Sequence, residues 1–235
     1  MKTVRLLPLM AKITMSPKIA SKVSQDYWAL YHKPHTDVPL KSYEVYYNKI
    51  VEIMKPKKNE TILDAGCGGG EITYLFHRDG FNIKGFDSSE YLVANARRRF
   101  GSHLFYVDDL INMGNCKQRF TKVFLNGVFL CIHPAYYKVA LRNLFNITED
   151  NGIVYLFGNP DYSRRNRLYR RYRAQLLNFL TLFLPIYNAV FSGFWVKTKD
   201  LQKIALNSGF SKVEKLDAWV PYKCHHILFK SRAVS

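Results

Sequence analysis

The sequence predicts an α/β protein built on a doubly wound, mostly parallel sheet of seven strands. From residue 61 onwards, short apolar runs alternate with amphipathic segments of helical period, which is typical of a parallel sheet covered by helices. The last two apolar runs are joined by a short connection, so an antiparallel edge is expected. Two stretches stand outside the alternation: residues 1–58 are expected to form an N-terminal helical cap, and residues 161–198 a helical insert after the fifth strand.

The elements follow one another in a regular order, and glycine or proline marks several of their ends. Residues 59–160 supply five strands and residues 199–235 complete the sheet with two more. Ser88 or Ser89 is expected to cap the third helix. The strands are expected at residues 61–67, 82–87, 103–110, 122–130, 152–160, 213–220 and 225–230. The helices are expected at residues 42–54, 71–80, 88–100, 135–147 and 200–210.

Composition narrows the class of protein. Of the 235 residues, 48% are hydrophobic and 23% are charged, so wholesale disorder is excluded. The formal net charge of +17 favours an anionic partner, which leaves nucleic acid, an acidic membrane face and a phosphorylated substrate open. The four cysteines are scattered without a CxxC pair, which predicts reduced thiols in the cytoplasm and no metal site.

A glycine-rich turn is the sharpest motif. In ILDAGCGGGEI, residues 62–72, an apolar strand delivers Asp64 and then breaks into glycines before the next helix. Glycine is needed where the backbone turns sharply and where a ligand approaches the main chain without a Cβ in the way. Two further strands end in acids, Asp87 in GFDSS and Asp109 in YVDDL.

Together LDAGCGGG, GFD and VDDL resemble the motifs of the class I S-adenosylmethionine-dependent methyltransferases, which share a Rossmann-like fold. The resemblance covers residues 60–229 and implies S-adenosylmethionine as the cofactor. It implies that the glycine loop holds the methionine moiety, Asp87 the ribose and Asp109 the adenine, with Asn126 facing the sulfonium and Tyr27 of the cap close to it. The cofactor-binding residues that it implies are Asp64, Gly66, Cys67, Gly68, Gly70, Asp87, Ser88, Asp109, Leu110, Asn126 and Tyr27.

The resemblance departs from the family pattern after the fourth strand. Many members carry histidines there, whereas this chain has NGVFLCI, with Leu130 and Cys131 at those positions. His133 is the nearest substitute for a general base, which methyl transfer needs only when the acceptor is a hydroxyl or an ammonium. His225 and His226 lie in the predicted last strand, where alternation would point one of them inward, and a packing role is expected.

The insert changes character halfway. An arginine-rich run (Arg164, Arg165, Arg167, Arg170, Arg171 and Arg173) precedes twenty-three uncharged residues, 174–196. If the uncharged run crossed a bilayer, the last two strands would lie on the opposite side from the rest of the sheet, so a transmembrane helix is not expected. No RNA-binding module accompanies the arginine-rich run, which disfavours an arm that binds nucleic acid. Two readings remain open: helices lying at an anionic membrane surface, as the similarity to quinone-biosynthesis O-methyltransferases suggests, or a soluble cap over the acceptor pocket.

The predicted function is methyl transfer from S-adenosylmethionine to an oxygen or nitrogen of a small molecule. The acceptor is expected to be apolar or anionic, as a lipid, quinone or sugar precursor would be. The expected location is cytoplasmic, with peripheral membrane association under the first reading of the insert. An RNA methyltransferase is the alternative enzyme, and a catalytically silent protein of the same fold is the non-enzyme alternative.

Overall fold

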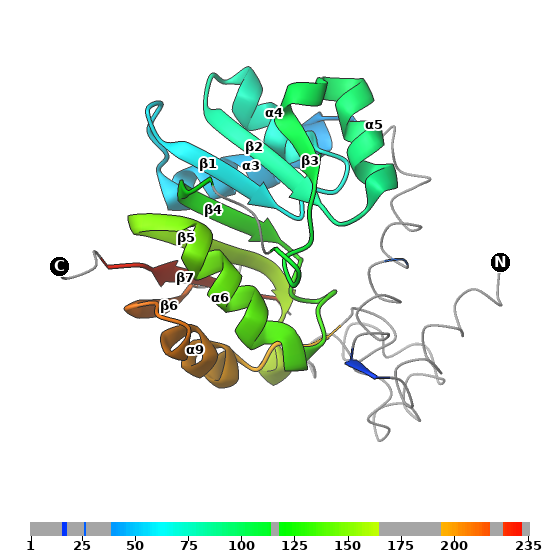
Figure 1. Ribbon diagram of the computed structural model, residues 1–235. Coiled ribbons are helices and arrows are strands. Elements are labelled where there is room, and N and C mark those ends of the chain that lie inside the picture. Colours follow the sequence, from blue (N-terminus) through cyan, green and yellow to red (C-terminus); the bar gives the residue numbers. More distant parts are fainter. Residues whose placement is uncertain are drawn as a thin grey trace.

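A single seven-stranded sheet forms the centre of the molecule (Figure 1). The computed structural model describes residues 16–17, 26, 39–113, 118–164, 194–216 and 223–231. Its strands lie in the order β3-β2-β1-β4-β5-β7-β6, and the first five are parallel to their neighbours, while β7 runs antiparallel to β5 and β6. The predicted fold class is therefore confirmed. The strands are β1 (Thr61–Ala65), β2 (Asn82–Asp87), β3 (Phe105–Val107), β4 (Phe120–Asn126), β5 (Thr148–Pro160), β6 (Lys212–Leu216) and β7 (Lys223–Phe229).

Helices cover both faces of this sheet. The helices are α3 (Lys41–Met54), α4 (Glu71–Arg78), α5 (Glu90–Phe100), α6 (Tyr137–Ile147) and α9 (Thr198–Asn207). Helices α3 and α4 pack on one face, where they share one cluster of buried apolar side chains. Helices α6 and α9 pack on the other face and share a second cluster. The alternating apolar and polar positions of each helix explain this arrangement, because the apolar stripe must be buried.

Local signals in the sequence explain where two helices begin. Ser89 caps α5, because its hydroxyl accepts a hydrogen bond from the backbone N–H of Leu92 at 3.3 Å. Gly70 precedes α4 with a φ of +83°, a left-handed conformation that glycine adopts without strain. An added Cβ there would lie 2.7 Å from the ring of Phe105, so this turn also needs a residue without a side chain.

Several strands differ in length from the prediction. The third ends at Val107, since Asp108 and Asp109 turn away from the sheet in a hydrogen-bonded loop. The fourth ends at Asn126, because Gly127 has a φ of +70° and starts the loop that leads to α6. The fifth begins four residues earlier than expected, at Thr148. Strand β6 is described from Lys212 to Leu216, and residues 217–220 of the predicted strand lie outside the described residues.

The last strand corrects one expectation. Alternation predicts one buried histidine, but His225 and His226 are both buried, with exposed fractions of 1% and 0%. Strand β7 lies between β5 and β6 rather than at the edge, and both faces of the sheet are covered there, so alternate side chains point into two interiors. The packing role is confirmed for His225, whose Nδ1 lies 2.7 Å from the buried hydroxyl of Tyr155.

Candidate functional site

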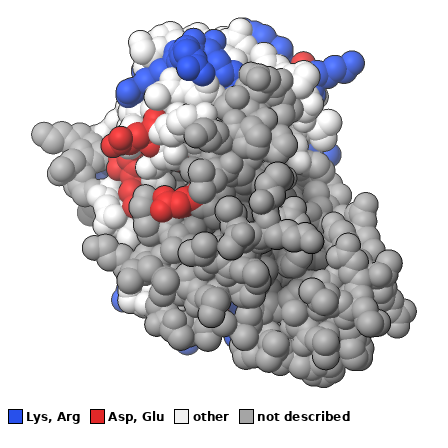
Figure 2. Space-filling model, turned by 90° about the vertical axis from the view of Figure 1, so that its right-hand side faces the viewer, with Lys and Arg blue, Asp and Glu red and all other residues white. Residues whose placement is uncertain are grey.

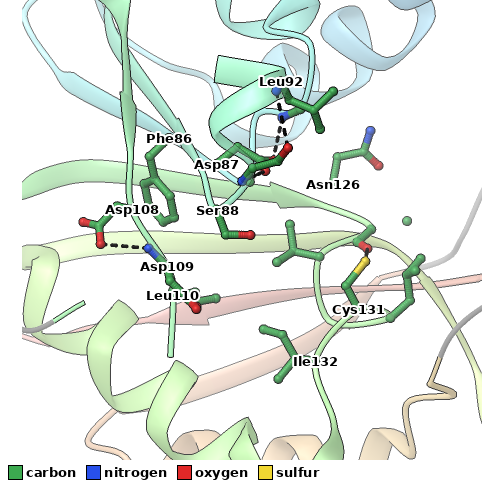
Figure 3. Close-up of a pocket in the computed structure, with 17 residues that line it drawn as sticks. Phe86, Asp87, Ser88, Leu92, Asp108, Asp109, Leu110, Asn126, Cys131 and Ile132 are labelled. Carbon is green, nitrogen blue, oxygen red and sulfur yellow. Dashed lines mark hydrogen bonds between the residues drawn. The ribbon is translucent and has the colours of Figure 1, made fainter. Parts of the chain in front are cut away.

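A cavity of 260 Å³ opens at the carboxyl ends of β1, β2 and β4. Ligands of open α/β sheets bind at this edge, where the chain crosses from one half of the sheet to the other. Figure 3 shows Asp87 and Ser88 between two groups of residues, with Asp108 and Asp109 to one side and Asn126 and Cys131 to the other. The lining residues are Gly66, Gly68, Phe86, Asp87, Ser88, Ser89, Leu92, Asp108, Asp109, Leu110, Asn126, Gly127, Val128, Leu130, Cys131, Ile132 and Gly158.

Two glycines of the turn after β1 form the floor of the cavity. Gly66 has a φ of +87°, and a Cβ on it would lie 2.4 Å from Cγ2 of Val128. Gly68 has a φ of +55°, and a Cβ on it would meet nothing within 4 Å. The space in front of Gly68 is therefore open to a ligand that approaches the main chain.

Asp87 is held at the end of β2 by two backbone hydrogen bonds. Its Oδ2 accepts from the N–H of Gly68 at 2.9 Å, and its Oδ1 accepts from the N–H of Ser89 at 2.9 Å. A carboxylate has about four lone-pair sites, so it can accept hydrogen bonds from more groups than these two backbone donors. The first bond also fixes the glycine turn against β2, so a single side chain shapes two walls of the cavity.

Both aspartates after β3 line the cavity, whereas the sequence singled out only Asp109. Asp109 is engaged in its own turn: its Oδ1 accepts from the N–H of Ile111 at 2.8 Å and its Oδ2 from Nδ2 of Asn112 at 3.1 Å. Asp108 accepts a 2.8 Å hydrogen bond from the N–H of Asp109 through Oδ1. The pair VDD was visible in the sequence, and its first member is an additional candidate for ligand binding.

The opposite wall comes from the end of β4 and the loop after it. Asn126, Leu130 and Cys131 line it, and the Cys131 thiol lies 3.9 Å from the carbonyl oxygen of Gly127. Gly158 of β5 faces this wall, and a Cβ there would lie 2.5 Å from Oδ1 of Asn126. The absence of a side chain at Gly158 therefore leaves room for the Asn126 amide.

Three of the predicted cofactor residues do not line the cavity. Asp64 is buried behind the glycine turn, where it accepts a 2.7 Å hydrogen bond from the hydroxyl of Thr73, and burial raises its pKa to about 7. Burial likewise raises the pKa of the Cys67 thiol. Gly70 caps α4. These residues support the turn, while Gly66, Gly68, Asp87, Ser88, Asp109, Leu110 and Asn126 are brought together around the cavity.

His133 lies beside the cavity rather than in its lining. Its Nδ1 accepts a 3.2 Å hydrogen bond from the N–H of Ala135, which caps the 3-10 helix at Pro134–Tyr136. Its ring packs edge-on against Phe194, with the ring centroids 5.1 Å apart. When Nδ1 of a neutral imidazole accepts a hydrogen bond, the proton of the ring is on Nε2. In this arrangement His133 has no nitrogen available to take a proton from the molecule that is methylated.

Phe194 is the first described residue at the returning end of the insert, and its backbone bonds to the cavity wall. Its N–H donates a 2.8 Å hydrogen bond to the carbonyl of Leu130. Residues 165–193 of the insert, with five of its six clustered arginines, lie outside the described residues, as does Tyr27; of Arg164 only the backbone is described. Sequence reasoning missed the apolar lining from Phe86, Leu92, Val128 and Ile132, since such residues are indistinguishable in sequence from ordinary core.

Comparison with known proteins agrees with this geometry. A family model described as "Methyltransferase domain" matches residues 62–152. Residues 62–152 are a methyltransferase domain. Solved structures with the same fold include S-adenosylmethionine-dependent methyltransferases, one of them with bound S-adenosylmethionine.

A curated relative and two solved structures extend the comparison. The putative methyltransferase YqeM of Bacillus subtilis (strain 168) is 27% identical over 117 residues, and this match spans less than half of each protein, 46% of this chain and 45% of the relative. A TehB-like S-adenosylmethionine-dependent methyltransferase from Corynebacterium glutamicum has the same fold with a TM-score of 0.58 at 16% identity, covering 89% of this chain and 98% of its own. Magnesium protoporphyrin IX methyltransferase from Synechocystis PCC 6803, with bound S-adenosylmethionine, gives 0.61 at 15% identity, covering 93% and 99%.

The residues of the cavity fit this cofactor. The open space before Gly68 admits a ligand against the main chain, and the Asp87 carboxylate lines the cavity as the kind of acceptor that a pair of hydroxyls requires. Asp87, Asp108 and Asp109 place three carboxylates around the cavity, which suits a ligand that carries a sulfonium and an ammonium. Within the described residues, no helix has the length and apolar character needed to cross a bilayer.

Proposed function

We propose that the protein transfers the methyl group of S-adenosylmethionine to an oxygen or nitrogen of a small-molecule acceptor held between the cavity and the insert. The hydrogen bond from Phe194 to Leu130 carries this proposal, since it joins the returning end of the insert to a residue that lines the cavity. The acceptor would thus be bounded by the Leu130–Ile132 loop and by Phe194 at the returning end of the insert.

Methyl transfer mainly requires that the acceptor atom be aligned with the methyl group of the cofactor. The cofactor supplies an activated methyl group, and holding the acceptor in line with it accounts for much of the rate. Asn126 and the loop from Gly127 to Ile132 would position the acceptor atom and exclude water. We assign no general base, because the described arrangement of His133 caps a helix and packs on Phe194.

The class of acceptor rests on the sequence of the insert. Its uncharged run, residues 174–196, favours an apolar body, and the arginines before it favour an anionic group or an anionic membrane surface. If arginines hold the protein at such a surface, replacing all six with glutamine should abolish its cosedimentation with anionic vesicles. Retained binding would remove the membrane surface from the proposal and leave a soluble cap.

A methylation screen with matched variants tests the function. Extracted small molecules, lipids and RNA are incubated with S-adenosylmethionine and with wild-type protein, Asp87→Ala or the exposed control Glu52→Ala. Mass spectrometry should find a methyl gain in a small molecule or lipid with wild type and control, and none with Asp87→Ala. The cofactor affinity of Asp87→Ala should fall at least tenfold, because the charge-assisted hydrogen bonds between this carboxylate and the two cofactor hydroxyls are lost.

Each contrary outcome has a distinct meaning. Cofactor affinity that is unchanged in Asp87→Ala contradicts the assignment of the cofactor site. A methyl gain confined to RNA would replace the small molecule with RNA as substrate. Tight cofactor binding without a methyl gain in any fraction would indicate a silent protein of this fold.

A further inference from the structure

A second groove lies at the opposite end of the sheet from the cofactor cavity. It has a volume of 350 Å³ and is bounded by residues that precede β1, begin β2 and precede β3. The cofactor cavity opens at the carboxyl ends of the same strands, so the β1–β3 half of the sheet separates the two sites. Its lining residues are Lys58, His77, Gly80, Phe81, Asn82, Ile83, Lys84, His103 and Leu104.

Two lysine ammonium groups are held in place at this groove. Lys58 donates a hydrogen bond to the carbonyl of Asp79, and its Nζ lies 3.7 Å from the centre of the Phe81 ring. Lys84 donates a hydrogen bond to the carbonyl of His103. An ammonium has three donor hydrogens, so each lysine retains two after bonding to the backbone. These bonds direct both ammonium groups towards the groove.

Two imidazole rings complete the polar lining. His77 and His103 meet edge to face, with ring centroids 5.4 Å apart. No carboxylate is among the residues that line the groove. The neighbouring acid, Asp79, is occupied, since its Oδ2 accepts a 2.5 Å hydrogen bond from Tyr47 and its Oδ1 a 2.8 Å hydrogen bond from Nε of Arg78.

The balance of charge decides which ligand suits the groove. Two histidines could ligate a metal cation, but two ammonium groups, with no carboxylate among the described lining residues, oppose a cation and favour an anion. Fixed N–H donors from lysine and imidazole suit the oxygens of a phosphate. The other end of the sheet differs: Figure 2 shows the right-hand side of Figure 1, where β1, β2 and β4 end, and there a group of aspartate and glutamate side chains lies below the lysine and arginine side chains.

We propose that the groove between Lys58, His77, Lys84 and His103 is a binding site for a small molecule that carries a phosphate group. Its volume of 350 Å³ falls within the range of small-ligand sites, roughly 300–1,000 Å³, and suits a compact phosphorylated molecule rather than a polymer or a lipid surface. The site is separate from the cofactor cavity, so phosphate binding there does not depend on the methyl-transfer reaction.

Inorganic phosphate is the probe for a test on the full chain. Two-dimensional amide and imidazole NMR spectra are recorded during titration with phosphate and, at matched ionic strength, with chloride. Phosphate should cause saturable shifts confined to residues 58, 77–84 and 102–104, and chloride should not. In the double variant Lys58→Gln/Lys84→Gln the affinity for phosphate should fall at least tenfold, while Lys58→Arg/Lys84→Arg retains part of it and Lys138→Gln on α6 all of it.

Three results would overturn the proposal. Shifts that grow linearly and equally with both salts would identify an ordinary solvated basic face. Unchanged phosphate affinity in the double glutamine variant, with its fold verified by its amide spectrum, would remove the lysines from the site. Binding of an RNA oligonucleotide or of anionic vesicles at these residues without binding of inorganic phosphate would replace the small molecule with a macromolecular partner.

Discussion

Gly68 is the residue at which the requirement for a small side chain can be separated from the requirement for a flexible backbone. Its φ of +55° costs an ordinary residue about 1–2 kcal/mol, but a Cβ there would touch no protein atom. Gly68→Ala should therefore fold, with its free energy of unfolding lowered by about 1–2 kcal/mol. Because the Cβ enters the cavity, S-adenosylmethionine affinity should fall more than tenfold, as measured by isothermal titration calorimetry.

Gly80→Ala is the matched control for this prediction. Gly80 has a φ of +79° and its added Cβ would lie 3.7 Å from the nearest atom, the Nζ of Lys58, so the backbone cost is similar. Gly80 is remote from the cofactor cavity. Equal losses of cofactor affinity in the two variants would mean that backbone strain, rather than occupation of the cavity, accounts for the effect at Gly68.

The same residues show how far the sequence predicts the site. Asp87 and the glycines were identifiable because a strand that ends in a carboxylate, or in a turn with positive φ, leaves a local signature. Asp64 has an equally clear signature but lies behind the turn, bonded to Thr73. Sequence spacing places a residue at the end of a strand; whether its side chain faces the ligand or supports the loop depends on the packing of the following helix.

At the level of elements, β7 shows what periodicity leaves undecided. The sequence predicts both the strand and its antiparallel direction. It does not give the order β5-β7-β6, because an edge strand and an interior strand share the same period of two. Only the interior position makes consecutive residues such as His225 and His226 buried together.

That position makes His226 the source of a pH-dependent stability. Among the described residues, neither of its ring nitrogens has a hydrogen-bond partner, and burial, followed by the neighbouring Lys215, lowers its pKa to about 4. The folded state binds this proton more weakly than the unfolded state, so the stabilisation is fully present above about pH 6.5 and is lost as the pH falls towards 4. From the two pKa values, wild type should lose about 3 kcal/mol of unfolding free energy over this window.

His226→Met isolates this contribution. The variant removes a buried polar ring without a partner, so it should be at least as stable as wild type at pH 7. Its unfolding free energy, measured by urea titration, should fall less than that of wild type between pH 6.5 and pH 4. His77→Gln serves as the exposed control and should follow wild type. Parallel curves for wild type and His226→Met would exclude His226 as the titrating group.

At the level of the whole molecule, the two ends of the insert are fastened to each other and to the core. Tyr162 donates a 2.9 Å hydrogen bond to Val196, and Val196 donates one of 2.8 Å to Pro160. Asp161, between them, is buried and accepts a 2.8 Å hydrogen bond from Lys215 of the edge strand β6. The sequence predicts where the insert begins and ends, but an ion pair between positions so distant in the chain leaves no local pattern.

Replacing Asp161 and replacing Lys215 should lower the free energy of unfolding by different amounts. The Asp161 side chain is 1% exposed and that of Lys215 is 32% exposed. Lys215→Met removes the cation from a buried carboxylate that keeps its two hydrogen bonds from Ser163, at a cost of about 3 kcal/mol. Asp161→Ala leaves an ammonium that reaches water, at a cost of about 2 kcal/mol. Urea unfolding of the single and double variants should therefore show a double variant less destabilised than the sum of the singles.

Hydrogen exchange shows whether this ion pair fastens the insert or only the strand. In Lys215→Met, the amides of Tyr162 and Val196 should exchange faster than in wild type, while those of β1 and β4 keep their protection. Lys212→Met is the control on the same strand, because its pair with Glu214 is exposed and surface pairs contribute about 0–1 kcal/mol. If protection is lost evenly over the sheet, the ion pair stabilises the whole domain. The ends of the insert would then exchange no faster, relative to wild type, than the other strands. Protection lost only at residues 160–163 and 195–197 would establish that the ion pair holds the two described ends of the insert together from the far edge of the sheet, through a carboxylate that does not line the cavity.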